Sequence, residues 1–163
     1  MPLHRPVDPN IMPDPLQRCG LARRLAAILY DSFLLLAVLF LAMLLLLPLN
    51  LLLPLNQGEA FASHNPLVTS YLFIVSFLFF AWFWTHGGQT LGMRAWKIRV
   101  QTFDGKGLSW WQALLRFLMA IASTLTLGLG FIWSLFDRDR LTWHDRFSET
   151  ELVILKDQKK RSA

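Results

Sequence analysis

The stretch RRLAAILYDSFLLLAVLFLAMLLLLP, from Arg23 to Pro48, decides the fold class. The 23 residues from Leu25 to Leu47 contain only two ionisable side chains, those of Tyr30 and Asp31. A helix that crosses a bilayer needs about 20 predominantly apolar residues. A soluble helix of this length would carry a polar stripe with a period of about 3.6 residues, and none is present after Ser32. The stretch therefore predicts a transmembrane helix in an integral membrane protein.

The rest of the chain has the same character. Hydrophobic residues make up 54% of the 163 residues and charged residues only 17%. Two more apolar blocks, 67–85 and 110–136, follow the first at 25–47. Residues 1–20 contain five prolines and no apolar run, so we expect a disordered tail rather than a cleavable signal peptide. We divide the chain into this tail, a membrane domain at 21–155 and a basic tail at 156–163.

The third apolar block allows two topologies. The segment STLTLGLG interrupts it, and the first arm, Trp110 to Ser123, would be roughly 21 Å long, too short for a hydrocarbon core of about 30 Å. A re-entrant hairpin and a conventional third span both remain open. KIRVQTF, from Lys97, and ELVIL, from Glu151, are strand candidates. If they pair as a small cytoplasmic β element, both ends of the block lie on one side of the membrane, which favours the hairpin.

The basic residues predict the orientation, because they concentrate in cytoplasmic loops. The first loop, 48–66, contains none, whereas the N-terminal tail, the second loop and the C-terminal tail are all basic. We therefore expect a multi-pass membrane protein with a cytoplasmic N-terminus. The net charge of +5 and the tail KDQKKRSA favour contact with anionic lipid headgroups rather than nucleic acid.

Asp31 needs an explanation, since a carboxylate at the centre of a span costs about 2.5–3.5 kcal/mol. Arg116 lies six residues into the third block, at a comparable depth. An ion pair between Asp31 and Arg116 would neutralise both charges and fix how the segments pack. Alternatively, Asp31 titrates and forms a proton- or cation-binding site. Asp145 is expected to pair with Arg140, Arg24 or Arg94.

The remaining residues and motifs of interest do not indicate a catalytic or a metal-binding site. Cys19 is the only cysteine, so no intramolecular disulfide can form. The four histidines are scattered, which predicts no metal site, and no cofactor motif or catalytic nucleophile is present. HGGQTLG, from His86, is interpreted as a helix stop. Trp82 and Trp84 are interpreted as interfacial anchors at the end of the second span.

Four segments in order resemble the RDD family of bacterial membrane proteins. They are Arg24, Ala27 and Asp31 in the pattern R-x-x-A-x-x-x-D, then GQTLGMRAWKIRV, GLSWWQALLR and RLTWHDRFSET. The resemblance covers roughly residues 20 to 155. It implies that the arginine and two aspartates of the family name are Arg24, Asp31 and Asp145; Arg23 fits the spacing less well. Met93 stands where members often carry a basic residue.

We therefore expect an all-α polytopic membrane protein with a polar centre formed by Arg24, Asp31, Arg116 and Asp145. The resemblance implies a location in the bacterial inner (plasma) membrane. It also implies a transport role, for which cation/proton exchange has been suggested in some members. Because so few segments cannot enclose a pathway alone, we expect an oligomer. The alternative is a non-transporting scaffold or assembly factor for a membrane partner. We do not expect an enzyme.

Overall fold

The computed structural model describes residues 19–52, 66–139 and 141–155. Most of the first tail, most of the first loop, Arg140 and the basic tail therefore lie outside the described residues. The elements along the chain are α1 (Leu21–Leu52), α2 (Pro66–His86), α3 (Leu91–Ala95), β1 (Ile98–Thr102), α4 (Trp110–Leu125), α5 (Leu129–Phe136), α6 (Trp143–Phe147) and β2 (Thr150–Ile154).

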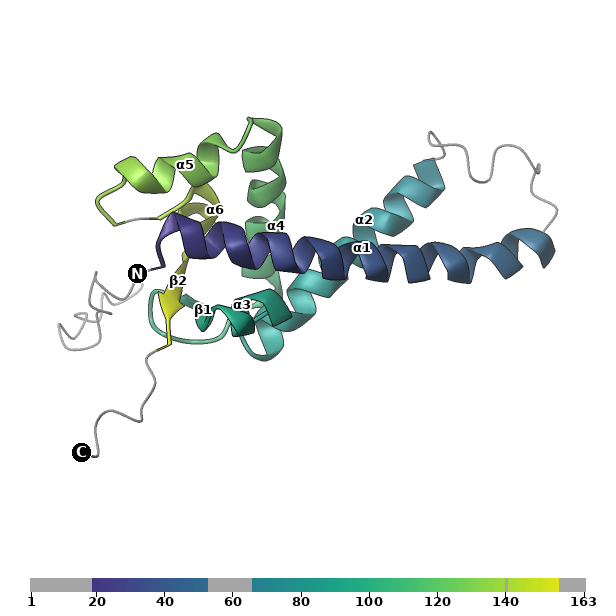
Figure 1. Cartoon of the computed structure of the whole chain (residues 1–163), viewed down its shortest axis with the longest axis horizontal. Coiled ribbons are helices and arrows are strands. Elements are labelled where there is room, and N and C mark those ends of the chain that lie inside the picture. The colour runs from purple at the N-terminus through teal and green to yellow at the C-terminus, as the bar shows by residue number, and fades with distance from the viewer. Residues whose placement is uncertain (1–18, 53–65, 140, 156–163) are drawn as a thin grey trace, which may run out of the picture.

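Helices α1 and α2 are long and apolar enough to cross a membrane. Their mean hydropathies are 2.5 and 1.9, and only 11% of each apolar window is buried inside the protein. Large side chains such as Leu36, Phe40 and Leu45 are exposed along α1. Figure 1 shows the C-terminal part of α1 and the N-terminal part of α2 extending away from the other elements, which gather around the N-terminal half of α1. The prediction of a mostly helical membrane protein is confirmed.

Helix α1 extends beyond both ends of the span predicted at 25–47. Helix α1 continues through Pro48 and ends at Leu52. A proline inside a helix removes one backbone hydrogen bond, but membrane helices tolerate this when local adjustments satisfy the freed carbonyl. The span predicted at 25–47 therefore lies within a longer helix, whereas α2 matches the span predicted at 67–85 to within one residue at each end.

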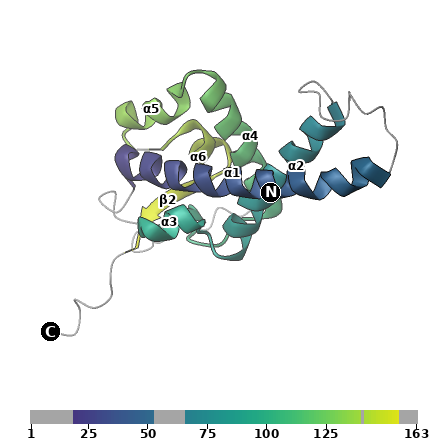
Figure 2. The same cartoon turned by 45° about the vertical axis from the view of Figure 1, so that its right-hand side comes forward.

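The third apolar block is a bent pair of helices and not a straight span. Helices α4 and α5 meet at 96° across a break of three residues, inside the predicted interruption. Gly128 caps the second helix with a left-handed backbone, φ 81°. At Gly130 a Cβ would lie 2.0 Å from the Ser123 hydroxyl, so only glycine lets the two helices meet this closely. Figure 2 shows α5 folded back from α4 over α6.

The two predicted strands form an antiparallel pair, β1–β2, in which Val100 lies opposite Leu152. The two strands are joined by the whole α4–α5–α6 segment rather than by a hairpin turn. The chain therefore leaves the sheet after β1 and returns to it at β2, which supports a re-entrant course for α4 and α5.

Aromatic side chains join α2 to α4. Phe117 packs against Phe73, Phe77 and Phe80 with ring centroids 5.4, 5.6 and 6.2 Å apart. Trp84 stacks on Phe80 and is only 6% exposed, so its prediction as an interfacial anchor is wrong. Its neighbour Trp82 is 57% exposed, as the prediction requires. The two tryptophans lie on different faces because two residues span about 200° of an α-helix.

A topology measurement tests the re-entrant course. In a Cys19→Ala background, we expect Lys106→Cys and Arg138→Cys, exposed positions before α4 and after α5, to react with a membrane-impermeant thiol reagent from the same side. Gln57→Cys, in the loop of the sequence between the first two spans, should react from the opposite side. Labelling of Lys106→Cys and Arg138→Cys from opposite sides would contradict the account.

Candidate functional site

Asp145 is the centre of the buried polar site. It is the third residue of the short helix α6, which begins with a capping box. The Thr142 backbone N–H donates to Asp145 Oδ2 at 3.1 Å, and the Asp145 N–H donates to the Thr142 hydroxyl at 3.4 Å. The side chain of Asp145 is fully buried. The cap thus holds the carboxylate in a fixed orientation, with both oxygens available to further donors.

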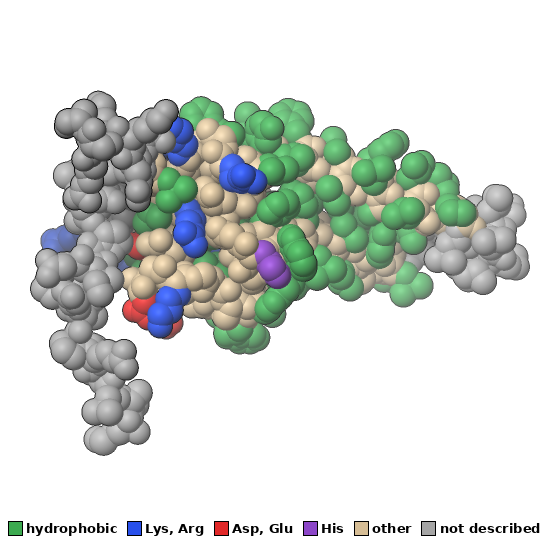
Figure 3. All heavy atoms as spheres, turned by 90° about the horizontal axis from the view of Figure 1, so that it is seen from below, with side chains coloured by type: hydrophobic (Ala, Val, Ile, Leu, Met, Phe, Trp, Pro, Cys, Tyr) green, Lys and Arg blue, Asp and Glu red, His purple; other side chains and the backbone are tan. Residues whose placement is uncertain are grey.

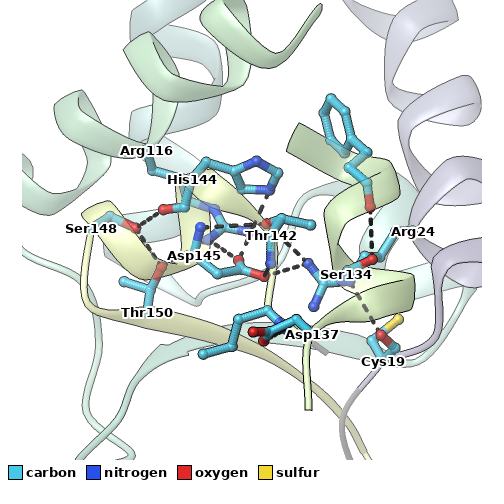
Figure 4. A network of polar contacts seen from close by, with 12 residues as sticks. Cys19, Arg24, Arg116, Ser134, Asp137, Thr142, His144, Asp145, Ser148 and Thr150 are labelled. Atoms are coloured by element: carbon cyan, nitrogen blue, oxygen red, sulfur yellow. Dashed lines mark hydrogen bonds and ion pairs between the residues drawn. The ribbon is translucent and has the colours of Figure 1, made fainter. Parts of the chain in front are cut away.

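Two arginines from separate helices donate to this carboxylate (Figure 4). Arg24, in the first turn of α1, forms an ion pair with Oδ2, and Arg116, in the middle of α4, donates to Oδ1 at 2.6 Å. Both guanidinium groups are at least 97% buried. Of the three partners expected for Asp145, the described structure confirms Arg24. Arg94 is exposed, and Arg140 lies outside the described residues.

Neutral groups satisfy further donors of the two arginines. Arg24 donates to the Cys19 carbonyl at 3.2 Å, and Arg116 donates to the Thr150 hydroxyl of β2 at 2.7 Å. The Arg116 guanidinium also lies over the Trp84 ring, 5.5 Å from its centroid, within the range of a cation–π interaction. The network therefore connects the membrane helices α1, α2 and α4 to α6 and the sheet.

The network shifts the pKa values of two residues of α6, Asp145 and His144. Burial alone would raise the pKa of Asp145, but the guanidinium groups of Arg24 and Arg116 outweigh it and hold that pKa well below its usual range. Burial lowers the pKa of His144 to about 3, although Asp145 opposes the shift. His144 is therefore neutral and Asp145 ionised at physiological pH.

Asp31 is separate from this ion-pair network. Its carboxylate accepts hydrogen bonds from the Thr90 hydroxyl at 2.5 Å and the Gly92 backbone N–H at 2.8 Å. A Cβ at Gly92 would lie 2.5 Å from the Ala27 carbonyl oxygen and 2.8 Å from Asp31 Cγ, so glycine is required there. The GQTLG segment is thus more than a helix stop, because it brings two donors to the carboxylate.

The predicted ion pair between Asp31 and Arg116 is wrong. Among the described residues, the hydrogen-bond partners of Asp31 are the neutral groups of Thr90 and Gly92, and no cation pairs with it. The prediction matched the depths of the two side chains in the membrane, but depth leaves the rotation of each helix about its axis undetermined. Arg116 faces α6, whereas Asp31 faces α3.

A cavity of about 450 Å³ lies between the membrane helices and touches both polar groups. Its lining is mostly apolar, with Ile28 and Leu35 from α1, Phe80 from α2, and Phe117 and Ile121 from α4. Polar side chains complete the lining, namely Arg24, Asp31, Ser32, Ser76, Trp84, Arg116, Thr124 and His144. Among these residues Asp31 is the one acid. The part of the chain that the structure describes contains no cluster of His, Cys, Asp and Glu fit for a metal ion.

Several residues that contact the site were not predicted from the sequence. Thr142 could have been found from the capping-box pattern T-x-x-D before a short helix. Thr90, Thr150 and Trp84 could not, because each is an ordinary residue type whose role depends on which helix packs beside it. Their contribution comes only from tertiary contacts.

The RDD family model matches residues 18–149 of the chain. This range includes Arg24, Asp31, Arg116 and Asp145. No curated protein and no solved structure matches the chain.

Acid should destabilise the fold through His144. Unfolded His144 takes up a proton as the pH falls below 6.5, whereas the folded side chain does not until about pH 3. The unfolded state then binds more protons, so stability falls with decreasing pH by about 1.4 kcal/mol per unit at most. Between pH 6.5 and about pH 4, melting curves in detergent should shift less for His144→Gln than for the wild type. His86→Gln, at an exposed histidine, should keep the wild-type slope; an equal slope in His144→Gln would contradict the burial of a neutral imidazole.

Proposed function

The chain belongs to the RDD family, and on that premise we propose that it is a transport protein of the bacterial inner membrane, with proton-coupled cation exchange as its reaction. Asp31 is the proposed site at which a proton and a cation bind in turn. No enzymatic step is part of the proposal.

One observation carries this proposal. Asp31 is 3% exposed, lies within the membrane helix α1 and lines the cavity, yet its donors are neutral. An ionisable group within a membrane helix is costly, and such groups generally mark ion or proton pathways. A carboxylate without a cationic partner is able to exchange a proton for a cation, because either one neutralises it. Asp145 cannot exchange a proton for a cation in this way, since Arg24 and Arg116 already neutralise it.

The charged surface supports a cytoplasmic position for the polar end of the molecule. Figure 3 shows the Lys and Arg side chains of one face at the end opposite the apolar extension of α1 and α2. Cytoplasmic segments are enriched in such residues, and anionic lipid headgroups attract them. We propose that the N-terminus is cytoplasmic and that the basic tail contacts these headgroups. Because the apolar faces of α1 and α2 are exposed, we also propose that several copies assemble to enclose the pathway.

A scaffold function is the second candidate, and the ion-pair network favours it. Asp145 and its two arginines are buried and directly paired, which fixes helix packing without leaving a group free to move. In a scaffold or assembly factor, deletion of the protein would change the abundance of a membrane partner and leave ion gradients unaltered.

Proton-coupled cation flux, measured in vesicles reconstituted with the protein, tests the transport proposal. Asp31→Asn keeps an oxygen that can accept the Gly92 N–H but cannot ionise, so proton-coupled cation flux should fall to the background of protein-free vesicles. The matched control Asp104→Asn, at an exposed position between β1 and α4, should retain wild-type flux. Wild-type flux in a folded Asp31→Asn protein would remove the carrier role and leave the scaffold. Capture of a partner from mild detergent would then be the direct evidence for it.

A further inference from the structure

The Thr90 hydroxyl forms hydrogen bonds in two directions at the start of α3. It donates to Asp31 Oδ2 at 2.5 Å, and its oxygen accepts the Met93 backbone N–H at 3.2 Å as the N-cap of the helix. The Thr90 side chain is fully buried. One hydroxyl therefore both begins α3 and bonds the carboxylate at which we propose that a proton and a cation bind.

The two donors to Asp31 differ in what they can do when the carboxylate takes up a proton. The Gly92 backbone N–H, which lies 2.8 Å from Oδ1, can only donate. A hydroxyl can both donate and accept, and its hydrogen rotates to suit its partners. A proton on Oδ1 would oppose the Gly92 N–H, whereas Thr90 Oγ1 can accept a proton carried by Oδ2. The geometry therefore favours Oδ2 as the oxygen that is protonated.

We propose that Thr90 is a positioning residue that directs the proton to Oδ2 of Asp31 and sets the pH at which the proton is released, an inference that rests on the proposed transport function. In the ionised state Thr90 donates to Oδ2. When a proton binds, an O–H bond forms at Oδ2, the Thr90 hydroxyl rotates, and its oxygen accepts from the new hydroxyl. Thr90 keeps its own proton throughout, so Asp31 gains one proton and no other group changes its charge.

The reversal of this hydrogen bond leaves α3 in place. Thr90 Oγ1 has two lone pairs, so it can accept from Asp31 and from the Met93 N–H at the same time. The Gly92 N–H keeps its bond to Oδ1 in both states. Asp31 can therefore gain and lose a proton while α3 stays in contact with α1. The rotated hydroxyl no longer donates to a carboxylate, so the bond from Thr90 favours the ionised form.

Other titratable groups do not compete with Thr90 for Asp31. Among the described residues, the hydrogen-bond partners of Asp31 are Thr90 and Gly92. The titratable groups of the elements around Asp31 have other partners, are neutral or are exposed. They are Arg24 in α1 and Arg116 in α4, which pair with Asp145, Tyr71 in α2, which donates to the Ala42 carbonyl, the neutral His144 in α6, and the exposed Arg23 and Tyr30 in α1, His86 in α2 and Arg94 in α3. Helix α5 contains no titratable group.

An infrared titration tests the role of Thr90 without a flux measurement. The full-length protein would be reconstituted in phosphatidylcholine vesicles, and the carbonyl band of protonated Asp31 would be identified by its absence in Asp31→Asn. Thr90→Val replaces the hydroxyl with a methyl group of similar size and removes the donor to the carboxylate. Because a hydrogen bond to a charged group favours the ionised form, the midpoint of the titration should rise by roughly one to two pH units.

Three further variants separate the hydrogen bond from the helix cap. Thr90→Ser keeps the hydroxyl and should restore the wild-type midpoint. Ser109→Ala removes the N-cap of α4, which is not a partner of Asp31, and should leave the midpoint unchanged. Thr90→Cys carries a thiol, which is a weak donor, so it should shift the midpoint in the same direction by a smaller amount. It provides the test if Thr90→Val fails to fold.

The outcomes distinguish this inference from the transport proposal. An unchanged midpoint in folded Thr90→Val or Thr90→Cys would overturn the role of Thr90 and leave the transport proposal standing. So would a shift in Thr90→Ser or Ser109→Ala as large as that in Thr90→Val. A wild-type protein without an Asp31 band at any pH would overturn both. The expected shift in a protein that shows no cation flux would support the role of Thr90 and overturn the transport proposal alone.

Discussion

The described structure depends on one buried carboxylate held between two guanidinium groups. Asp145 receives Arg24 from α1 and Arg116 from α4, which are separated by more than ninety residues of chain. Removing one member of a buried ion pair typically costs about 3–5 kcal/mol, because the remaining charge stays buried without compensation. The same arrangement contributes less than this to net stability, since desolvation opposes it. Its main consequence is geometric, because it joins the first helix, the first helix of the bent pair, α6 and the sheet at one point.

The buried carboxylate of Asp31 is stabilised in a different way from that of Asp145. Its carboxylate is bonded by Thr90 and Gly92 at the start of α3, so it positions a short connecting segment against α1 without a cation. Asp145 is neutralised and fixed in place, whereas Asp31 lies at a cavity and keeps its ability to exchange partners. The two aspartates of one motif set are thus chemically unlike, and this difference underlies the separate structural and transport roles that we propose for them.

The sequence predicted the features that depend on composition and on position along a helix. The spans, the interruption near Gly128 and the two strands all follow from hydropathy and turn residues. Charge placed Arg24 among three candidate partners of Asp145, and the structure selects it. The hydrogen-bond partners of Asp31 could not be predicted in this way. Arg116 lies at the same expected depth in the membrane as Asp31, but its side chain faces a different helix. The burial of Trp84 was missed for a similar reason. Aromatic residues at a span end resemble interfacial anchors until the neighbouring helix is placed.

A double-mutant cycle between Arg24 and Asp145 tests the central ion-pair network most directly. The unfolding free energies of Arg24→Gln, Asp145→Asn and the double variant would be measured in mixed micelles with increasing denaturing detergent. Neutralising Asp145 alone leaves two buried arginines uncompensated, so the double variant should be destabilised by at least about 1 kcal/mol less than the sum of the singles. Additivity to within about 0.5 kcal/mol would show that the two charges do not act together and would contradict the account.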